Sequence, residues 1–154
     1  MEKSTIEKIG ARFGLFTAIA LVLFFFLMKG IGLLEQYELR ILNVFILFAG
    51  VFLAMREYRR KFSSPQYLAG IGVGLMTSAV ALILFSTFVV IYLANNPVFM
   101  ETLKSYEYFG RYLNPYIAGF VIFLEGTISG LLMSYILMQY YKRSHLKEIE
   151  PSLP

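Results

Sequence analysis

The 154-residue sequence has no cysteine and no aspartate, and its one histidine, His145, lies close to the C-terminus. Without cysteine there can be no disulfide, thiolate metal site or cysteine nucleophile. With one histidine, a histidine-rich metal site cannot be assembled. The sequence also lacks a glycine-rich phosphate loop, a nucleophile elbow and an HExxH helix. We therefore expect no metal, no cofactor and no enzymatic activity.

Charge is scarce as well. Charged residues make up 16% of the chain and hydrophobic residues 58%, and the mean hydropathy is +0.65. A soluble domain has about 25% charged and roughly 45–50% apolar residues, because it must cover itself with polar surface. These proportions exclude a disordered chain, argue against a soluble enzyme and predict a single membrane domain over residues 1–154.

Four stretches are long and apolar enough to cross a hydrocarbon core of about 30 Å, which takes about 20 residues of helix. They cover approximately residues 10–34, 37–58, 67–94 and 115–141, with tails over 1–9 and 142–154. Such lengths without turn residues favour helices over strands, so the predicted fold is an all-α, integral membrane four-helix bundle. The first stretch is followed by Lys29-Gly30-Ile31-Gly32 rather than a cleavage site, and we interpret it as an uncleaved helix.

The basic residues predict the orientation of the four spans. Ten of the fourteen lie on the side of the two termini: Lys3, Lys8, Arg12, Arg56, Arg59, Arg60, Lys61, Lys142, Arg143 and Lys147. The other side has four: Lys29, Arg40, Lys104 and Arg111. By the positive-inside rule, both termini are expected to be cytoplasmic. Topology thus accounts for most of the net charge of +4, and we expect no nucleic-acid partner.

Six of the basic residues cluster where the second and fourth spans reach the cytoplasmic side: Arg56, Arg59, Arg60, Lys61, Lys142 and Arg143. Such a cluster is able to bind anionic lipid headgroups. Its role in fixing the topology is already a sufficient explanation, so both interpretations stay open.

A short amphipathic helix is predicted in the outer connection between the third and fourth spans. Asn95-Asn96-Pro97 ends the third span and supplies a cap for a new helix, with Pro97 at its first position. The amphipathic pattern runs over Val98–Phe109, and the helix ends near Gly110. One face is apolar and the other polar, with Phe99, Leu103 and Tyr106 against Glu101, Lys104 and Ser105. This helix is either a lid or docking element or an anchor that rests on lipid.

Small residues predict where the helices touch, because in lipid helices associate where their backbones approach closely. Each span has small residues at intervals of four, and the glycines expected at helix contacts are Gly14, Gly50, Gly70, Gly74, Gly126 and Gly130. They lie mainly in the cytoplasmic half, whereas phenylalanines dominate the outer half. We therefore expect wider helix spacing outside. This space is either a cleft for a lipid or apolar ligand, or it is filled by the phenylalanines.

Glu125 is the one acidic residue deep within a span. It lies three residues outward of Ile128, the midpoint of the fourth span, or about 4.5 Å at a rise of 1.5 Å per residue. A carboxylate near the bilayer centre costs several kcal/mol, so we expect the side chain to face protein or water and to favour its neutral form. The candidate polar neighbours are Ser129, Ser86, Thr87 and, farther outward, Lys29.

Three hypotheses for Glu125 remain open. The neutral side chain forms a hydrogen bond between helices, or the carboxylate meets a cation of a partner subunit, or it handles protons or cations in a transporter-like protein. The third hypothesis is weakened because a proton path normally needs a series of titratable groups, and no other acid lies deep in a span.

Two segments carry a resemblance to a known family. Residues 50–61 (GVFLAMREYRRK) lead from a short second span into a basic helix end, and residues 67–74 (YLAGIGVG) open the third span after a brief polar link. With the Asn-Pro start of the outer loop and the basic tail, the chain from about Lys8 to Lys142 resembles a bacterial membrane family catalogued as domain of unknown function 4199. The resemblance implies a small four-helix inner-membrane protein with no established activity, and it gives no role to Glu125.

The first functional hypothesis is a non-enzymatic, multi-pass protein of the bacterial inner membrane that serves as a structural or accessory component. Its expected partners are the lipid bilayer and either a membrane-protein partner or further copies of itself. The alternative is a small transporter or an ion- or proton-handling protein centred on Glu125.

Overall fold

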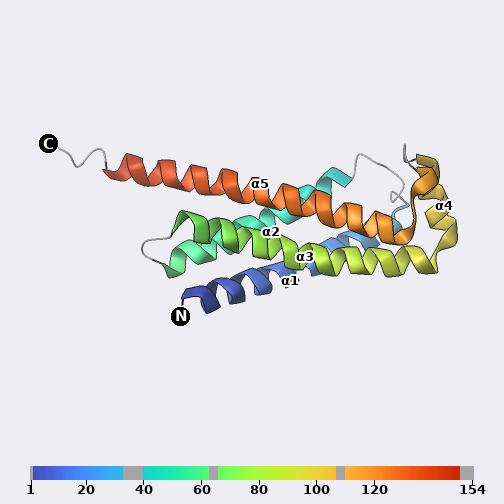
Figure 1. The fold of residues 1–154 in the computed structure, drawn as a ribbon, viewed down its shortest axis with the longest axis horizontal. Coiled ribbons are helices and arrows are strands. Elements are labelled where there is room, and N and C mark those ends of the chain that lie inside the picture. The colour runs from blue at the N-terminus through green and yellow to red at the C-terminus, as the bar shows by residue number, and fades with distance from the viewer. Residues whose placement is uncertain (1, 33–39, 63–65, 107–109, 150–154) are drawn as a thin grey trace.

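The computed structural model describes residues 2–32, 40–62, 66–106 and 110–149. Within these ranges every regular element is a helix (Figure 1): α1 (Glu2–Gly30), α2 (Arg40–Lys61), α3 (Tyr67–Asn95), α4 (Pro97–Tyr106), the 3-10 turn η2 (Gly110–Tyr112) and α5 (Pro115–Ile149). The prediction of an all-α bundle is confirmed, and a short helix follows the third span as expected.

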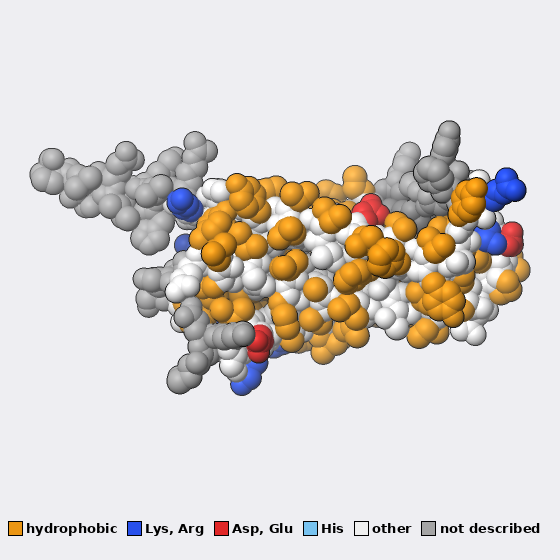
Figure 2. All heavy atoms as spheres, in the orientation of Figure 1, with side chains coloured by type: hydrophobic (Ala, Val, Ile, Leu, Met, Phe, Trp, Pro, Cys, Tyr) orange, Lys and Arg blue, Asp and Glu red, His pale blue; other side chains and the backbone are white. Residues whose placement is uncertain are grey.

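Four of the helices are long and apolar enough to cross a membrane, over Ser4–Gly30, Ile41–Lys61, Tyr67–Asn95 and Pro115–Lys142. Many of their large apolar side chains are exposed. Figure 2 shows hydrophobic side chains over the middle of the molecule, with the charged ones mostly at its two ends. Such a surface is unfavourable in water but suits hydrocarbon. The chain is therefore a multi-pass membrane protein whose surface contacts the lipid bilayer.

The helix ends differ from the predicted spans. α1 begins at Glu2 and α5 continues to Ile149, so most of both predicted tails is helical. Hydropathy marks the part of a helix that lies in hydrocarbon, whereas polar helix formers extend the same helix beyond it. α1 ends at Gly30 rather than near residue 34, because Gly32 takes a positive φ of 70° that stops the helix.

Other predicted boundaries shift by a few residues. α2 ends at Lys61 instead of residue 58, and its described part begins at Arg40. α4 begins at Pro97, as predicted, in the first turn, where proline loses no hydrogen bond. The predicted positions 33–39 and 107–109 lie outside the described residues.

The two ends of the bundle differ in chemistry. The start of α1, the end of α2 and the start of α3 lie at one end, with α5 extending past them (Figure 1). We call it the basic end, because it holds Arg12, Arg59 and Lys61. The opposite end, the α4 end, holds α4 and the start of α5, where the Ile117 N–H donates to Asn114 Oδ1 at 2.8 Å.

α3 is the centre of the bundle and packs against both α1 and α5. Two glycine–serine pairs interlock between α3 and α5. A Cβ on Gly74 would collide with the Ser134 side chain, and a Cβ on Gly130 would collide with Ser78. Both serine hydroxyls donate to backbone carbonyls of their own helices, so they are satisfied without leaving the contact.

The other four glycines expected at helix contacts also lie where helices meet. A Cβ on Gly14, Gly50, Gly70 or Gly126 would meet, respectively, the side chain of Val80, Thr17, Met138 or Leu82. Close approach is not restricted to the basic end, because Gly119, near the α4 end, meets Val90 in the same way. The outer half is therefore not uniformly wider, although a groove lies beside Gly119.

Aromatic rings fill the α4 end of the bundle. The centroids of Phe25 and Tyr92 lie 4.8 Å apart, and those of Tyr92 and Phe99 lie 5.8 Å apart, both edge to face. Beside Phe99 on α4, Met100 is buried and Leu103 packs against the same core. The apolar face of α4 therefore covers the end of the bundle instead of resting on lipid.

Candidate functional site

Glu125 lies midway along the length of the bundle, far in sequence from any other charged residue. Residues 115–141, which hold the membrane part of α5, include no other acidic or basic residue. Residues 41–55 of α2 and all of α3 include none either. In the described part of the chain, no three His, Cys, Asp or Glu side chains lie close enough to hold a metal ion. The candidate site therefore consists of one carboxyl group and what surrounds it.

The side chain of Glu125 is exposed on the outer surface of α5. Its neighbours on this surface, Val121 and Ile128, are exposed as well. Among the described residues it takes part in no hydrogen bond and no ion pair. Within the described residues, this position does not provide the hydrogen bond between helices that the first of the three hypotheses requires. The reason is that the inner face of α5 approaches α3 so closely at Gly126 and Gly130 that a glutamate does not fit there.

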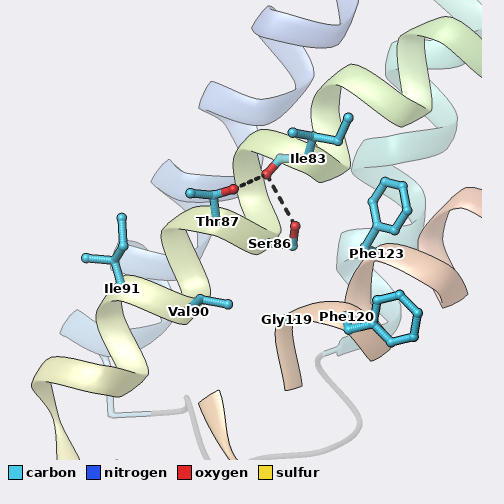
Figure 3. Close-up of a pocket in the computed structure, with 8 residues that line it drawn as sticks. All are labelled: Ile83, Ser86, Thr87, Val90, Ile91, Gly119, Phe120 and Phe123. Atoms are coloured by element: carbon cyan, nitrogen blue, oxygen red, sulfur yellow. Dashed lines mark hydrogen bonds between the residues drawn. The ribbon is translucent and has the colours of Figure 1, made fainter. Parts of the chain in front are cut away.

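The structure does not bring the expected polar partners to Glu125. The hydroxyls of Ser86 and Thr87 both donate to the carbonyl of Ile83, at 3.2 Å and 2.7 Å (Figure 3). Such bonds to the preceding turn satisfy a serine or threonine inside a helix. Ser129, one turn along α5, is half-buried.

Lys29 is also engaged elsewhere. Its Nζ lies 4.9 Å from the centroid of the Tyr92 ring, at the α4 end of α1. An ammonium group over an aromatic face is attracted by the ring's negative face. The only basic residue expected to reach towards Glu125 is thus held among the aromatic rings.

A shallow apolar groove lies between α3 and α5, towards the α4 end (Figure 3). Its volume is about 320 Å³, and α3 contributes Ile83, Ser86, Thr87, Val90 and Ile91, whereas α5 contributes Gly119, Phe120 and Phe123. The two hydroxyls in the lining already donate to Ile83. The groove therefore offers apolar contact without a free hydrogen-bond donor, which suits an acyl chain better than a polar ligand.

Two polar residues missed by the sequence analysis lie inside the bundle. Asn43 Oδ1 on α2 and Thr127 Oγ1 on α5 are buried and have no hydrogen-bond partner. The sequence does indicate Asn43 as a candidate contact residue. It lies alone in the apolar run 41–55, and an amide in hydrocarbon needs a hydrogen-bond partner. Thr127 gave no such sign, since threonine in a membrane helix usually bonds its own backbone.

The basic end carries the predicted cationic cluster. Arg56, Arg60, Lys61 and Lys142 are exposed. The Arg59 guanidinium lies 4.1 Å from the centroid of the Tyr141 ring and so joins α2 to α5. The side chain of Arg143 lies outside the described residues. This end therefore presents several cations to its surroundings from two neighbouring helices.

A family comparison adds a further observation. A family model described as "Protein of unknown function (DUF4199)" matches residues 12–108. The chain belongs to this family. The DUF4199 match covers most of α1 and all of α2, α3 and α4, and it ends before α5. Glu125 and the outer surface of α5 therefore lie outside the matched residues. No curated protein and no solved structure matches the chain.

Proposed function

We propose that this protein is a non-enzymatic structural or accessory component of a membrane assembly, and that α5 makes its contact with the rest of that assembly. The observation that carries the proposal is the position of Glu125, which is exposed on α5 midway along the bundle and has no partner among the described residues. α5 is also the least buried of the four spans. In its most apolar stretch of 18 residues, 17% of the residues are buried, against 28%, 33% and 39% in the corresponding stretches of the other three.

The physical argument is the cost of an unsatisfied carboxyl group in hydrocarbon. A polar group there lacks water, and a side chain on the outer surface of a single bundle finds no protein donor or acceptor. Contact with another membrane-spanning helix removes this cost by a hydrogen bond, as polar residues do between membrane helices. Assembly through α5 accounts for Glu125 without any catalytic role.

The proposal includes a location and an orientation. We place the protein in the bacterial inner membrane with both termini in the cytoplasm, because most basic residues gather at one end. The exposed cations at this end, Arg56, Arg60 and Lys142, then face the anionic cytoplasmic leaflet. A periplasm-active reporter fused after Pro154 should be inactive, whereas activity would reverse the orientation.

The transporter alternative gains no support from a specific observation. Glu125 lies on the outer surface of the bundle, and the hydroxyls of Ser86 and Thr87 are bonded to Ile83. A proton path normally needs a series of titratable groups, and residues 41–55, 67–95 and 115–141 include none besides Glu125 that is acidic or basic.

Chemical cross-linking in the native membrane tests the proposal. The protein should be recovered in a discrete species larger than its own 17.6 kDa, either with another membrane protein or with itself. Glu125→Leu should reduce the yield of that species, and Leu53→Ala, an exposed change on α2, should not. Recovery of the monomer alone, at every cross-linker concentration, would refute assembly.

A further inference from the structure

The exposed surface of α5 has a regular spacing. Five exposed side chains follow one another at intervals of four, three, four and three residues: Val121, Glu125, Ile128, Leu132 and Tyr135. We call this row the α5 seam. Its period of 3.5 residues is the one at which two helices stay in contact over several turns while they wind around each other with a left-handed twist.

The seam is the part of the α5 surface that stays exposed when α5 packs in its own bundle. The opposite face, with Gly126, Gly130 and Ser134, packs closely against α3. None of the five seam residues belongs to a core cluster of the described part of the bundle. A helix that joins the seam would therefore leave the bundle unchanged.

The chemistry of Glu125 restricts which helix can join the seam. A neutral carboxyl group has one donor and one free acceptor, so two of them can bond each other reciprocally. A twofold axis between two identical helices places the same residue of each copy face to face. In the apolar parts of the four spans of a second copy, residues 13–28, 41–55, 67–95 and 115–141 offer no cation, and the only acid is Glu125 itself.

We infer that two copies of this chain form a twofold-symmetric dimer along the α5 seam, in which two protonated Glu125 carboxyl groups donate to each other across the axis. The inference rests on the proposed function and specifies the partner as a second copy. It also explains the row of large apolar side chains, because Val121, Ile128 and Leu132 then pack against their counterparts.

The absence of native cysteine makes this arrangement directly testable, since each introduced cysteine is unique. Ile128→Cys places a thiol in the seam. Ile83→Cys is the matched control: its side chain is 52% exposed, against 58% for Ile128. The two positions lie within one helical turn of each other in depth, because Leu82 meets Gly126 and Ser78 meets Gly130. In membrane vesicles treated with copper phenanthroline, Ile128→Cys should form a disulfide-linked dimer, and Ile83→Cys should not.

Glu125 is tested by energy transfer between labelled copies, diluted with lipid in vesicles. Glu125→Leu should weaken the dimerisation constant about tenfold, equivalent to about 1.4 kcal/mol, because the reciprocal hydrogen bonds are lost. Glu125→Gln should remain close to the parent, since an amide also both donates and accepts. Unchanged dimerisation of Glu125→Leu would refute the carboxyl pair, even if the seam cross-links.

Failure of this inference can be told apart from failure of the proposed function. If Ile128→Cys cross-links no better than Ile83→Cys, the α5 dimer is wrong. If cross-linking in the native membrane still yields a stoichiometric complex with a different protein, the proposed function as an assembly component is retained, and the partner is that protein. When cross-linking yields the monomer alone, both proposals are wrong.

Discussion

The inner and outer faces of α5 are built from different kinds of residue. The inner face carries Gly126, Gly130 and Ser134, which fit against α3 so closely that an added Cβ would collide. The outer face carries Val121, Ile128 and other large apolar side chains around Glu125, and all of these are exposed. The inner face is complementary in shape to α3, and the outer face has no complement among the described residues.

This difference separates stability from association. In lipid, apolar side chains gain little by leaving hydrocarbon for a protein contact, so close packing and hydrogen bonds decide which helices associate. Changes on the inner face should therefore lower the stability of the single bundle. Changes on the outer face should alter what the bundle binds and leave its own stability unchanged. The following predictions test that separation from the largest effect to the smallest.

The largest effect is expected from Gly74→Leu. Even a Cβ at this position would collide with Ser134, so a leucine must push α3 and α5 apart. Over-packing of a tight contact costs about 3 kcal/mol at the upper end of its usual range. We expect the melting temperature in detergent, followed by circular dichroism, to fall by roughly 10 °C.

Gly72→Leu is the matched control for this prediction. Gly72 lies two residues away on the same helix, and nothing lies within 4 Å of a Cβ built on it. The same substitution should therefore leave the melting temperature unchanged or raise it slightly, because leucine favours a helix more than glycine does. Equal losses at the two positions would show that helix composition, and not the α3–α5 contact, sets the stability.

The sequence predicted a large part of this inner architecture. The four apolar runs identify the membrane helices, because nothing but a helix of that length satisfies its backbone in hydrocarbon. The sequence did not predict on which side of α5 the Glu125 side chain lies. The fourth span is apolar around most of its circumference, so its hydropathy marks no inner face. The side is decided by the fit of Gly126 and Gly130 against α3, which exists only in three dimensions.

An intermediate effect is expected on α4, which also has a packed and an exposed side. Phe99 contacts the Tyr92 ring, whereas the neighbouring Val98 is 81% exposed. Phe99→Ala removes a half-buried ring and should weaken the docking of α4 by about 1.4 kcal/mol, or about tenfold in the population of the undocked state. Tryptic cleavage after Lys104 should then be about tenfold faster than in the parent.

Val98→Ala should leave that cleavage rate unchanged, because the side chain makes little contact with the bundle. If both substitutions accelerate cleavage equally, α4 is not held by its apolar face. The amphipathic pattern predicted the face that carries Phe99 and Leu103. It could not say whether this face meets lipid or protein, because both are apolar and satisfy the same pattern.

The smallest effect is expected from Glu125→Leu in a detergent that keeps the protein monomeric. Glu125 forms no hydrogen bond or ion pair within the described residues, and its neighbours on the surface are apolar. The free energy of unfolding should change by less than about 0.5 kcal/mol, as for exposed substitutions without a partner. A loss comparable to that of Gly74→Leu would mean that Glu125 stabilises its own bundle. An unchanged melting temperature, combined with weaker dimerisation of the same variant in vesicles, would place the role of this carboxyl group wholly between chains.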